Sequence, residues 1–162
     1  MDLTAAIAAV ESNDAFKQFS KEHPKAYFAH AFSMVGPEDD FEWQLGYYAP
    51  DTRKLTVFKT VPVEKLPADD AYTEATIKRL DMATVTVQPM EARRITLAAK
   101  QEKFPAELIT KIILILQHLD RPLYNVTLVT MTFNIFNARI DAATGEIMSS
   151  EMRSIMSLRR DT

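Results

Sequence analysis

Three histidines are the side chains of this sequence best suited to bind a metal ion or to act as a general base. They are His23, His30 and His118, and no two of them lie at the short spacing that metal-binding motifs use. His30 and His118 fall in apolar stretches, where a hydrogen-bonded structural histidine is the first expectation. The alternative is a polar pair inside a ligand pocket, because these two occupy near-equivalent strands of the repeat described below. We predict no metal and no cofactor.

Carboxylates at Glu38, Asp39, Asp40 and Glu42 could attract a divalent cation, but their spacing does not match a calcium-binding loop. We therefore interpret this stretch as a solvated loop. The chain has no cysteine and only 3 glycines, which excludes thiolate chemistry and a glycine-rich phosphate-binding loop. Its serines, acids and bases form no recognisable nucleophile–base set. The expectation is a protein that is not an enzyme.

Aromatic residues suggest a different chemistry, the anchoring of a binding partner. Phe41, Trp43 and Tyr47 alternate with other residues over 41–48, and Tyr124 falls near the equivalent position of the second half. Tryptophan and tyrosine side chains that point outward from a strand are common at interface hot spots. Trp43, Tyr47 and Tyr124 are therefore the predicted partner-binding residues, and packing into the core is the alternative interpretation.

Helix and strand patterns in the first part of the chain would position these residues. Asp2 and Asn13 are suited to cap helices, so we predict one helix over 3–10 and another from residue 14 to the His23–Pro24 step, where proline ends it. Alternating apolar residues over 26–35, 41–48 and 55–60 predict strands. Turn-forming residues fill 36–40 and 49–54.

The rest of the chain repeats this order of patterns. A connector over 62–83 is predicted to contain a short helix from Asp69 or Asp70 to Leu80, and residues 84–87 are predicted to form a short β segment. A helix is predicted over 90–103, and strands over 111–119, over 123–130 and on both sides of a turn at 141–145. Residues 111–119, KIILILQHL, also suit a buried helix, but the internal symmetry favours a strand. The methionine-rich tail over 151–158 predicts a helix that closes the core or presents an adaptable partner surface.

One stretch carries a family resemblance. Within residues 125–150, the run Ala138-Arg139-Ile140-Asp141-Ala142-Ala143-Thr144-Gly145-Glu146-Ile147 resembles the strand, turn and strand that end a PepSY-type module. Asp141 can accept hydrogen bonds from turn amides, and Gly145 can adopt the left-handed conformation. Asp141, Thr144 and Gly145 are therefore predicted to be structural turn residues.

The resemblance implies an α+β fold with antiparallel β-sheets each packed by a helix. It implies two PepSY-like or cystatin-like repeats, each a helix followed by three strands, at 1–61 and 84–162, with a connector at 62–83 and a C-terminal helix. PepSY-like modules are commonly linked to peptidase regulation. The implied function is a non-catalytic module that recognises a peptide or protein. The alternative is a small-ligand-binding protein or enzyme with a pocket between helix and sheet.

Composition limits the location and the partners. Hydrophobic residues make up 47% of the chain, the formal net charge is −3, and no uninterrupted apolar run reaches the length of about 18 residues that a membrane span needs. The N-terminus has no basic residues before its apolar stretch, so we predict a cytoplasmic protein that does not bind membranes. No basic block is interleaved with aromatics, which argues against nucleic acid. A homodimer formed through edge strands or the tail is a further expectation.

Overall fold

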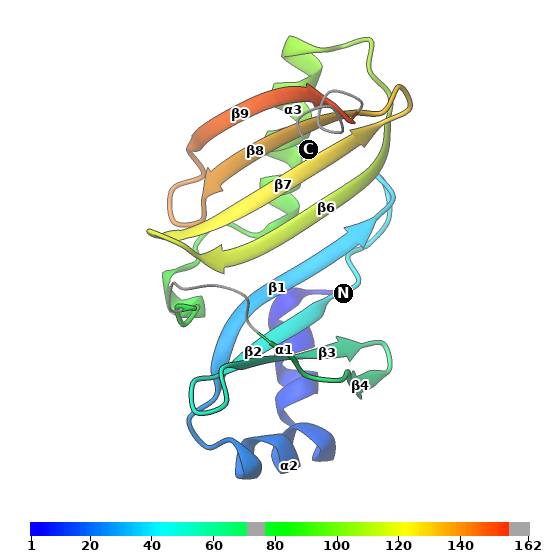
Figure 1. Ribbon diagram of the computed structural model, residues 1–162. Helices are drawn as coiled ribbons and strands as arrows, with labels where there is room; N and C mark the ends of the chain where they lie inside the picture. The colour runs from blue at the N-terminus through cyan, green and yellow to red at the C-terminus, as the bar shows by residue number, and fades with distance from the viewer. Residues whose placement is uncertain (71–76, 156–162) are drawn as a thin grey trace.

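The protein is built around one twisted antiparallel sheet with its helices on one side (Figure 1). The computed structural model describes residues 1–70 and 77–155. Its helices are α1 (Leu3–Glu11), α2 (Asp14–Glu22) and α3 (Pro89–Lys103), with a 3₁₀ turn, η1, at Met82–Thr84. Its strands are β1 (Tyr27–Val35), β2 (Gln44–Ala49), β3 (Lys54–Thr60), β4 (Val63–Lys65), β5 (Asp69–Asp70), β6 (Ile109–His118), β7 (Pro122–Thr130), β8 (Asn134–Asp141) and β9 (Ile147–Ser154).

Helices α1 and α2 begin and end where local chemistry dictates. The side chain of Asp2 accepts a hydrogen bond from the amide of Ala5, and that of Asn13 accepts one from the amide of Ala15. Each satisfies an amide that the first helical turn leaves without a backbone partner. Helix α2 stops at its C-cap, His23, directly before Pro24. The predicted boundaries of both helices are confirmed to within a residue.

The sheet runs in the order β4-β3-β2-β1-β6-β7-β8-β9, and β5 also pairs with β3. Strand β1 joins the two halves, since residues His30 to Val35 pair with Gln117 to Ile112 of β6. The expected α+β class is confirmed, but the halves form a single sheet and not separate ones. The predicted strand over 111–119 is also confirmed.

Three other segments differ from prediction. Strand β2 begins at Gln44, so residues 41–43 are irregular. Asp69 and Asp70 pair with Leu55 and Lys54 at the edge of β3 and do not begin a helix. Residues 77–80 are not helical, and the remaining part of that predicted helix, 71–76, lies outside the described residues. Residues 84–87 form no strand, although the amides of Thr86 and Val87 both donate to the carbonyl of Ala142.

The predicted C-terminal helix is wrong for residues 151–154. These residues extend β9, where Glu151 pairs with Asn137 and Met152 with Phe136. The methionine spacing that suggested a helix is overridden because pairing with β8 places Met152 against the core. Residues 156–158, the end of the same prediction, lie outside the described part of the chain.

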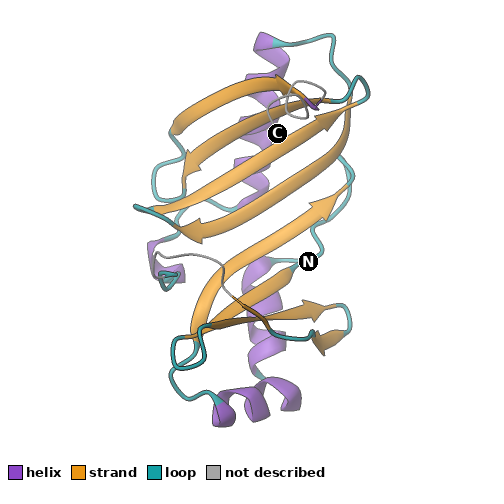
Figure 2. Ribbon diagram, viewed as in Figure 1, coloured by secondary structure: helices purple, strands orange, loops and turns teal. Residues whose placement is uncertain are grey.

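The core lies between the helices and one face of the sheet. Helix α3 covers the half formed by β6–β9, and α1 and α2 cover the half formed by β1–β3 (Figure 2). The core side chains alternate along the strands, as Ile112, Leu114 and Leu116 do on β6. No helix in the described ranges lies on the opposite face, which we call the open face. No helix among the described residues is long and apolar enough to cross a membrane.

Candidate binding surfaces

The predicted aromatic anchors belong to the core. Trp43, Tyr47 and Tyr124 are at most 3% exposed, and Trp43 donates its indole N–H to the carbonyl of Met1 at 2.7 Å. The hydroxyl of Tyr124 donates to the carbonyl of Val87 at 2.6 Å. These contacts correspond to the alternative interpretation of core packing. A partner cannot reach these side chains in the folded protein.

Tyr47 is the centre of an aromatic cluster under α2. Its ring centroid lies 4.9 Å from that of Phe16 and 5.7 Å from that of Phe58. Burial raises the pKa of Tyr47, and the carboxylate of Glu11 raises it further. Burial also raises the pKa of Glu11. The pair is a phenol that stays protonated beside a carboxylate, which suits packing and offers no nucleophile.

The histidines are not brought together. His30 pairs with Gln117 across β1 and β6, so the next residue, His118, emerges on the other face of the sheet. Burial lowers the pKa of His30. The Nδ1 atom of His23 lies 3.9 Å from a carboxylate oxygen of Asp51. His30 and His118 therefore do not form the polar pair that the pocket alternative required.

The acidic loop has internal partners. The carboxylate of Asp40 pairs with the amino group of Met1, which lowers the pKa of that carboxyl. The carboxylate of Asp39 accepts from the amide of Gly36 at 3.1 Å. No group of three or more histidine, aspartate or glutamate side chains within 1–70 and 77–155 is placed to hold a metal ion.

The turn between β8 and β9 is held by Asp141. Its carboxylate accepts hydrogen bonds from the amides of Ala143 and Thr144 at 2.8 and 3.2 Å, and Arg121 donates to it at 3.1 Å. The Ala143 amide is the main cause of the lowered pKa of Asp141, and Arg121 contributes. Gly145 has a φ of +82°, in the left-handed region. The hydrogen bonds of Asp141 and the conformation of Gly145 therefore stabilise the turn.

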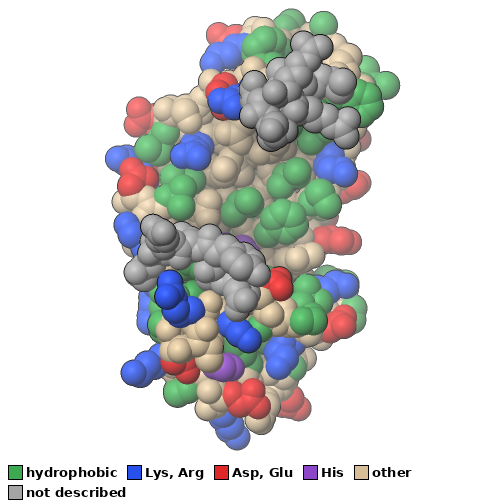
Figure 3. Space-filling model, in the orientation of Figure 1, with side chains coloured by type: hydrophobic (Ala, Val, Ile, Leu, Met, Phe, Trp, Pro, Cys, Tyr) green, Lys and Arg blue, Asp and Glu red, His purple; other side chains and the backbone are tan. Residues whose placement is uncertain are grey.

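The open face carries a group of partly exposed apolar side chains. The register pairs Phe32 with Ile115 and Met34 with Ile113, and residues directly opposite each other share a face. Val129 and Ile135 continue the group on β7 and β8. Figure 3 looks onto this face and shows hydrophobic side chains gathered near its centre. We call the six residues Phe32, Met34, Ile113, Ile115, Val129 and Ile135 the apolar stripe.

Polar and basic residues border the apolar stripe. Asn137 donates to the side chains of Asn125 and Thr127, which lie opposite Ile115 and Ile113. Lys111 and Arg139 share the open face and are exposed. Neither has an ion-pair partner in the part of the chain that the structure describes. An apolar patch with a polar border is typical of a protein interaction site.

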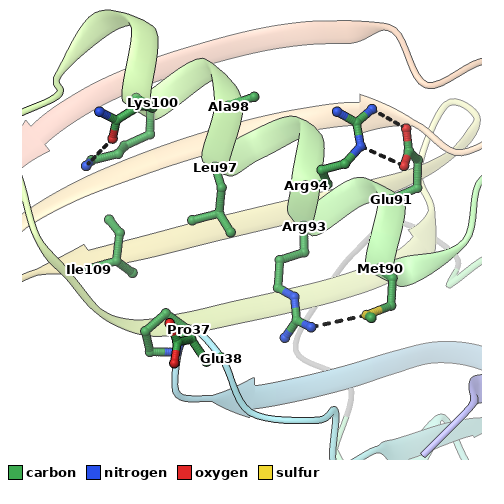
Figure 4. A pocket seen from close by; sticks show the side chains of 11 residues that line it. Pro37, Glu38, Met90, Glu91, Arg93, Arg94, Leu97, Ala98, Lys100 and Ile109 are labelled. Carbon is green, nitrogen blue, oxygen red and sulfur yellow. Dashed lines mark hydrogen bonds and ion pairs between the residues drawn. The ribbon is translucent and has the colours of Figure 1, made fainter.

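A second surface is a groove along α3, on the helix side. Its walls are α3, the loop after β1 and the start of β6, and it encloses about 850 Å³. Figure 4 shows the side chain of Leu97 pointing into it, with Ile109 and Pro37 on the facing walls. Arg93 lies toward one end and Lys100 toward the other. Arg94 is turned aside and pairs with Glu91.

Sequence reasoning missed the apolar stripe, although the signal was present. Residues 112–116 are apolar without interruption, whereas a strand with one solvent-exposed face has alternating apolar and polar residues. An unbroken run in a strand covered on one face leaves apolar side chains on the other face. The run KIILILQHL, whose pattern suits both a helix and a strand, therefore forms the β6 part of the candidate site.

The sequence and the fold can be compared with those of known proteins. The sequence matches no protein-family model and no curated protein. The fold is similar to the crystal structure of a protein from Clostridium difficile 630 that is described as a "putative lipoprotein". The two chains are 16% identical, the match covers 86% of this chain and 91% of that one, and the TM-score is 0.55. At this identity the similarity establishes the α+β fold alone.

Proposed function

We propose that this chain is a non-catalytic binding module that takes up a peptide or protein partner on its open face. The observation that carries the proposal is the apolar stripe, in which Phe32 and Met34 on β1 pair with Ile115 and Ile113 on β6, and Val129 on β7 pairs with Ile135 on β8. Single exposed apolar residues are normal on any protein, but a group of them on a sheet face that no described helix covers is typical of an interaction site. The buried carboxylate of Asp141 takes part in a turn, and the buried phenols of Tyr47 and Tyr124 take part in core packing.

The partner-binding interpretation predicts a specific loss of binding. Ile115 pairs with Phe32 in the apolar stripe, and Ile115→Glu places a charge there that a dry interface would have to desolvate. We expect this change to weaken binding by about tenfold or more. Leu108→Glu is the matched control, because Leu108 is 63% exposed and lies outside the apolar stripe.

The test uses the full chain as bait, with identification of captured partners and with hydrogen exchange in the presence of each identified one. A bound partner should slow the hydrogen exchange of β6 and β7. Ile115→Glu should abolish capture of this partner, and Leu108→Glu should leave its capture unchanged. Circular dichroism establishes that both variants fold. Equal capture by both variants would rule out the open face as the binding surface. Light scattering separates a second copy of the chain from a different protein.

We also propose that the chain is a tandem of two PepSY-like units, 1–61 and 84–162, joined by the connector 62–83. The sheet order supports this, because β1, β2 and β3 follow α2, β6, β7 and β8 follow α3, and the two sets of three strands mirror each other across the β1–β6 pair. The resemblance at residues 138–147 extends the proposal to regulation of a peptidase. To test this, the peptidase activity of each identified partner is measured with and without this chain. Inhibition by the chain would support the proposal.

For location we propose the cytoplasm, supported by the absence of cysteine. The Clostridium difficile protein of similar fold is described as a lipoprotein, which suggests a membrane-anchored alternative. Cell fractionation with an antibody to the chain distinguishes the two. Recovery in the membrane fraction would contradict a cytoplasmic location.

A further inference from the structure

Lys100 is the residue of α3 whose position packing does not explain. It follows Ala92 and Thr96 along the sheet-facing side of the helix and is only 5% exposed. A buried ammonium loses its hydration and needs oxygen partners in exchange. In the described part of the chain its hydrogen-bond partner is the Oε1 atom of Gln101, at 3.5 Å. That distance is the outer limit of a hydrogen bond.

The carboxylate of Glu107 does not supply the missing partner. Glu107 is close enough for Lys100 to lower its pKa slightly, but Thr132 and Asn134 are the main causes of that lowering. Both oxygens of Glu107 already accept hydrogen bonds, one from Thr132 at 2.6 Å and one from Asn134 at 2.9 Å. The ammonium of Lys100 therefore keeps donor capacity at the end of the α3 groove.

The groove beside Lys100 is apolar in its middle. Leu97 and Ile109 lie between Lys100 and Arg93 in Figure 4. Arg93 is already engaged, since it donates to the carbonyl of Asp39 at 2.7 Å and stacks 4.5 Å from the ring centroid of Phe41. Among these two described cations, the one with the weaker hydrogen-bond partner is thus Lys100.

We propose that the α3 groove binds a small molecule with one carboxylate and an apolar tail. The carboxylate accepts hydrogen bonds from the ammonium of Lys100, and the tail lies over Leu97 and Ile109. A second negative charge on the tail would meet Glu38 on the facing wall, so a monocarboxylate fits better than a dicarboxylate. This site is on the helix side of the sheet and is independent of the open face.

The test is a titration of the isotope-labelled full chain with octanoate, followed by nuclear magnetic resonance. Octan-1-ol and octylamine are the matched probes, since they share the tail and lack the carboxylate. We expect octanoate to shift the methyl signals of Leu97 and Ile109. Its affinity should be at least about tenfold higher than that of either matched probe. Lys100→Met should remove that preference. Lys103→Met, an exposed lysine one turn further along α3, should keep it.

Three results would overturn the proposal: no methyl shifts with octanoate, equal affinity for octanoate and octan-1-ol, or unchanged octanoate binding by Lys100→Met. If Lys100→Met does not fold, Leu97→Glu replaces it, because it places a carboxylate in the path of the tail. Loss of octanoate binding in that variant supports the site. Retained binding rejects it.

Discussion

The imidazole of His30 occupies the space that any side chain at Gly46 would need. These residues pair across β1 and β2 on the open face, and a Cβ atom at position 46 would lie 2.0 Å from Cε1 of His30. Gly46→Ala must therefore displace a ring that is itself largely buried. We expect a loss of about 1–3 kcal/mol in the free energy of unfolding, measured by urea denaturation.

A double-mutant cycle is the control for this clash. His30→Ala alone should cost stability, because it removes packing over the sheet. The double variant His30→Ala/Gly46→Ala should be more stable than the sum of the two single effects predicts, since the ring is no longer there to collide. Strict additivity would show that the two side chains do not compete for the same space.

His30 should also make stability depend on pH. Burial lowers its pKa in the folded protein, so the unfolded chain takes up a proton at a higher pH than the folded one. The stability due to the neutral imidazole is fully present above the unfolded pKa of about 6.5 and is lost as pH falls toward the lower folded value. The slope is at most about 1.4 kcal/mol per pH unit.

Urea denaturation between pH 7.5 and 5 measures this slope. Carboxylates with lowered pKa values, such as Asp141, lose their contribution at lower pH and do not overlap this window. His30→Gln should flatten the dependence. An equal slope in the variant would assign the pH dependence to another group.

Most of the fold could be predicted because the patterns that define its helices and strands lie within each element. Caps at Asp2 and Asn13 and the alternation within β1 and β3 are properties of neighbouring residues. The errors lie where a distant segment decides. Asp69 and Asp70 form β5 because they pair with the edge of β3. Residues 151–154 form a strand because they pair with the edge of β8.

The candidate sites were harder to predict than the fold. The apolar stripe exists because the register aligns Phe32 with Ile115, two residues 83 positions apart by their numbers. Lys100 resembles any exposed helix lysine in the sequence, and its burial depends on how α3 settles on the sheet. The apolar run 112–116 indicates a second apolar face of its strand, but neither the pairing of Ile115 with Phe32 nor the burial of Lys100 is encoded in a local pattern.

Trp43 should be essential for stability and not for binding. Its side chain is 2% exposed, packs 5.0 Å from the ring centroid of Phe41 and donates to Met1. Trp43→Ala should lower the free energy of unfolding by about 3–5 kcal/mol. Trp43→Phe should cost less, because it keeps most of the apolar volume and loses the hydrogen bond.

Circular dichroism during urea unfolding measures both Trp43 variants. The chain has a single tryptophan, so the fluorescence of the unmodified protein gives a second measurement. It should resist acrylamide quenching until the chain unfolds. Gln44→Ala, on the neighbouring half-exposed position, is the control and should change stability by less than about 1 kcal/mol. Strong quenching in the native state would contradict the burial of Trp43.

Gly145 should be required for its backbone conformation and not for its lack of a side chain. A Cβ at this position would meet Ile95 and Val87 at 3.6 Å, which is ordinary contact, but the φ of +82° is costly for most residues. Gly145→Ala should therefore destabilise the protein by about 1 kcal/mol, and Gly145→Asn by less, since asparagine tolerates the left-handed region better. Urea denaturation measures both. If Gly145→Asn is as damaging as Gly145→Ala, or more so, the cost comes from crowding against Ile95 and Val87 and not from the backbone.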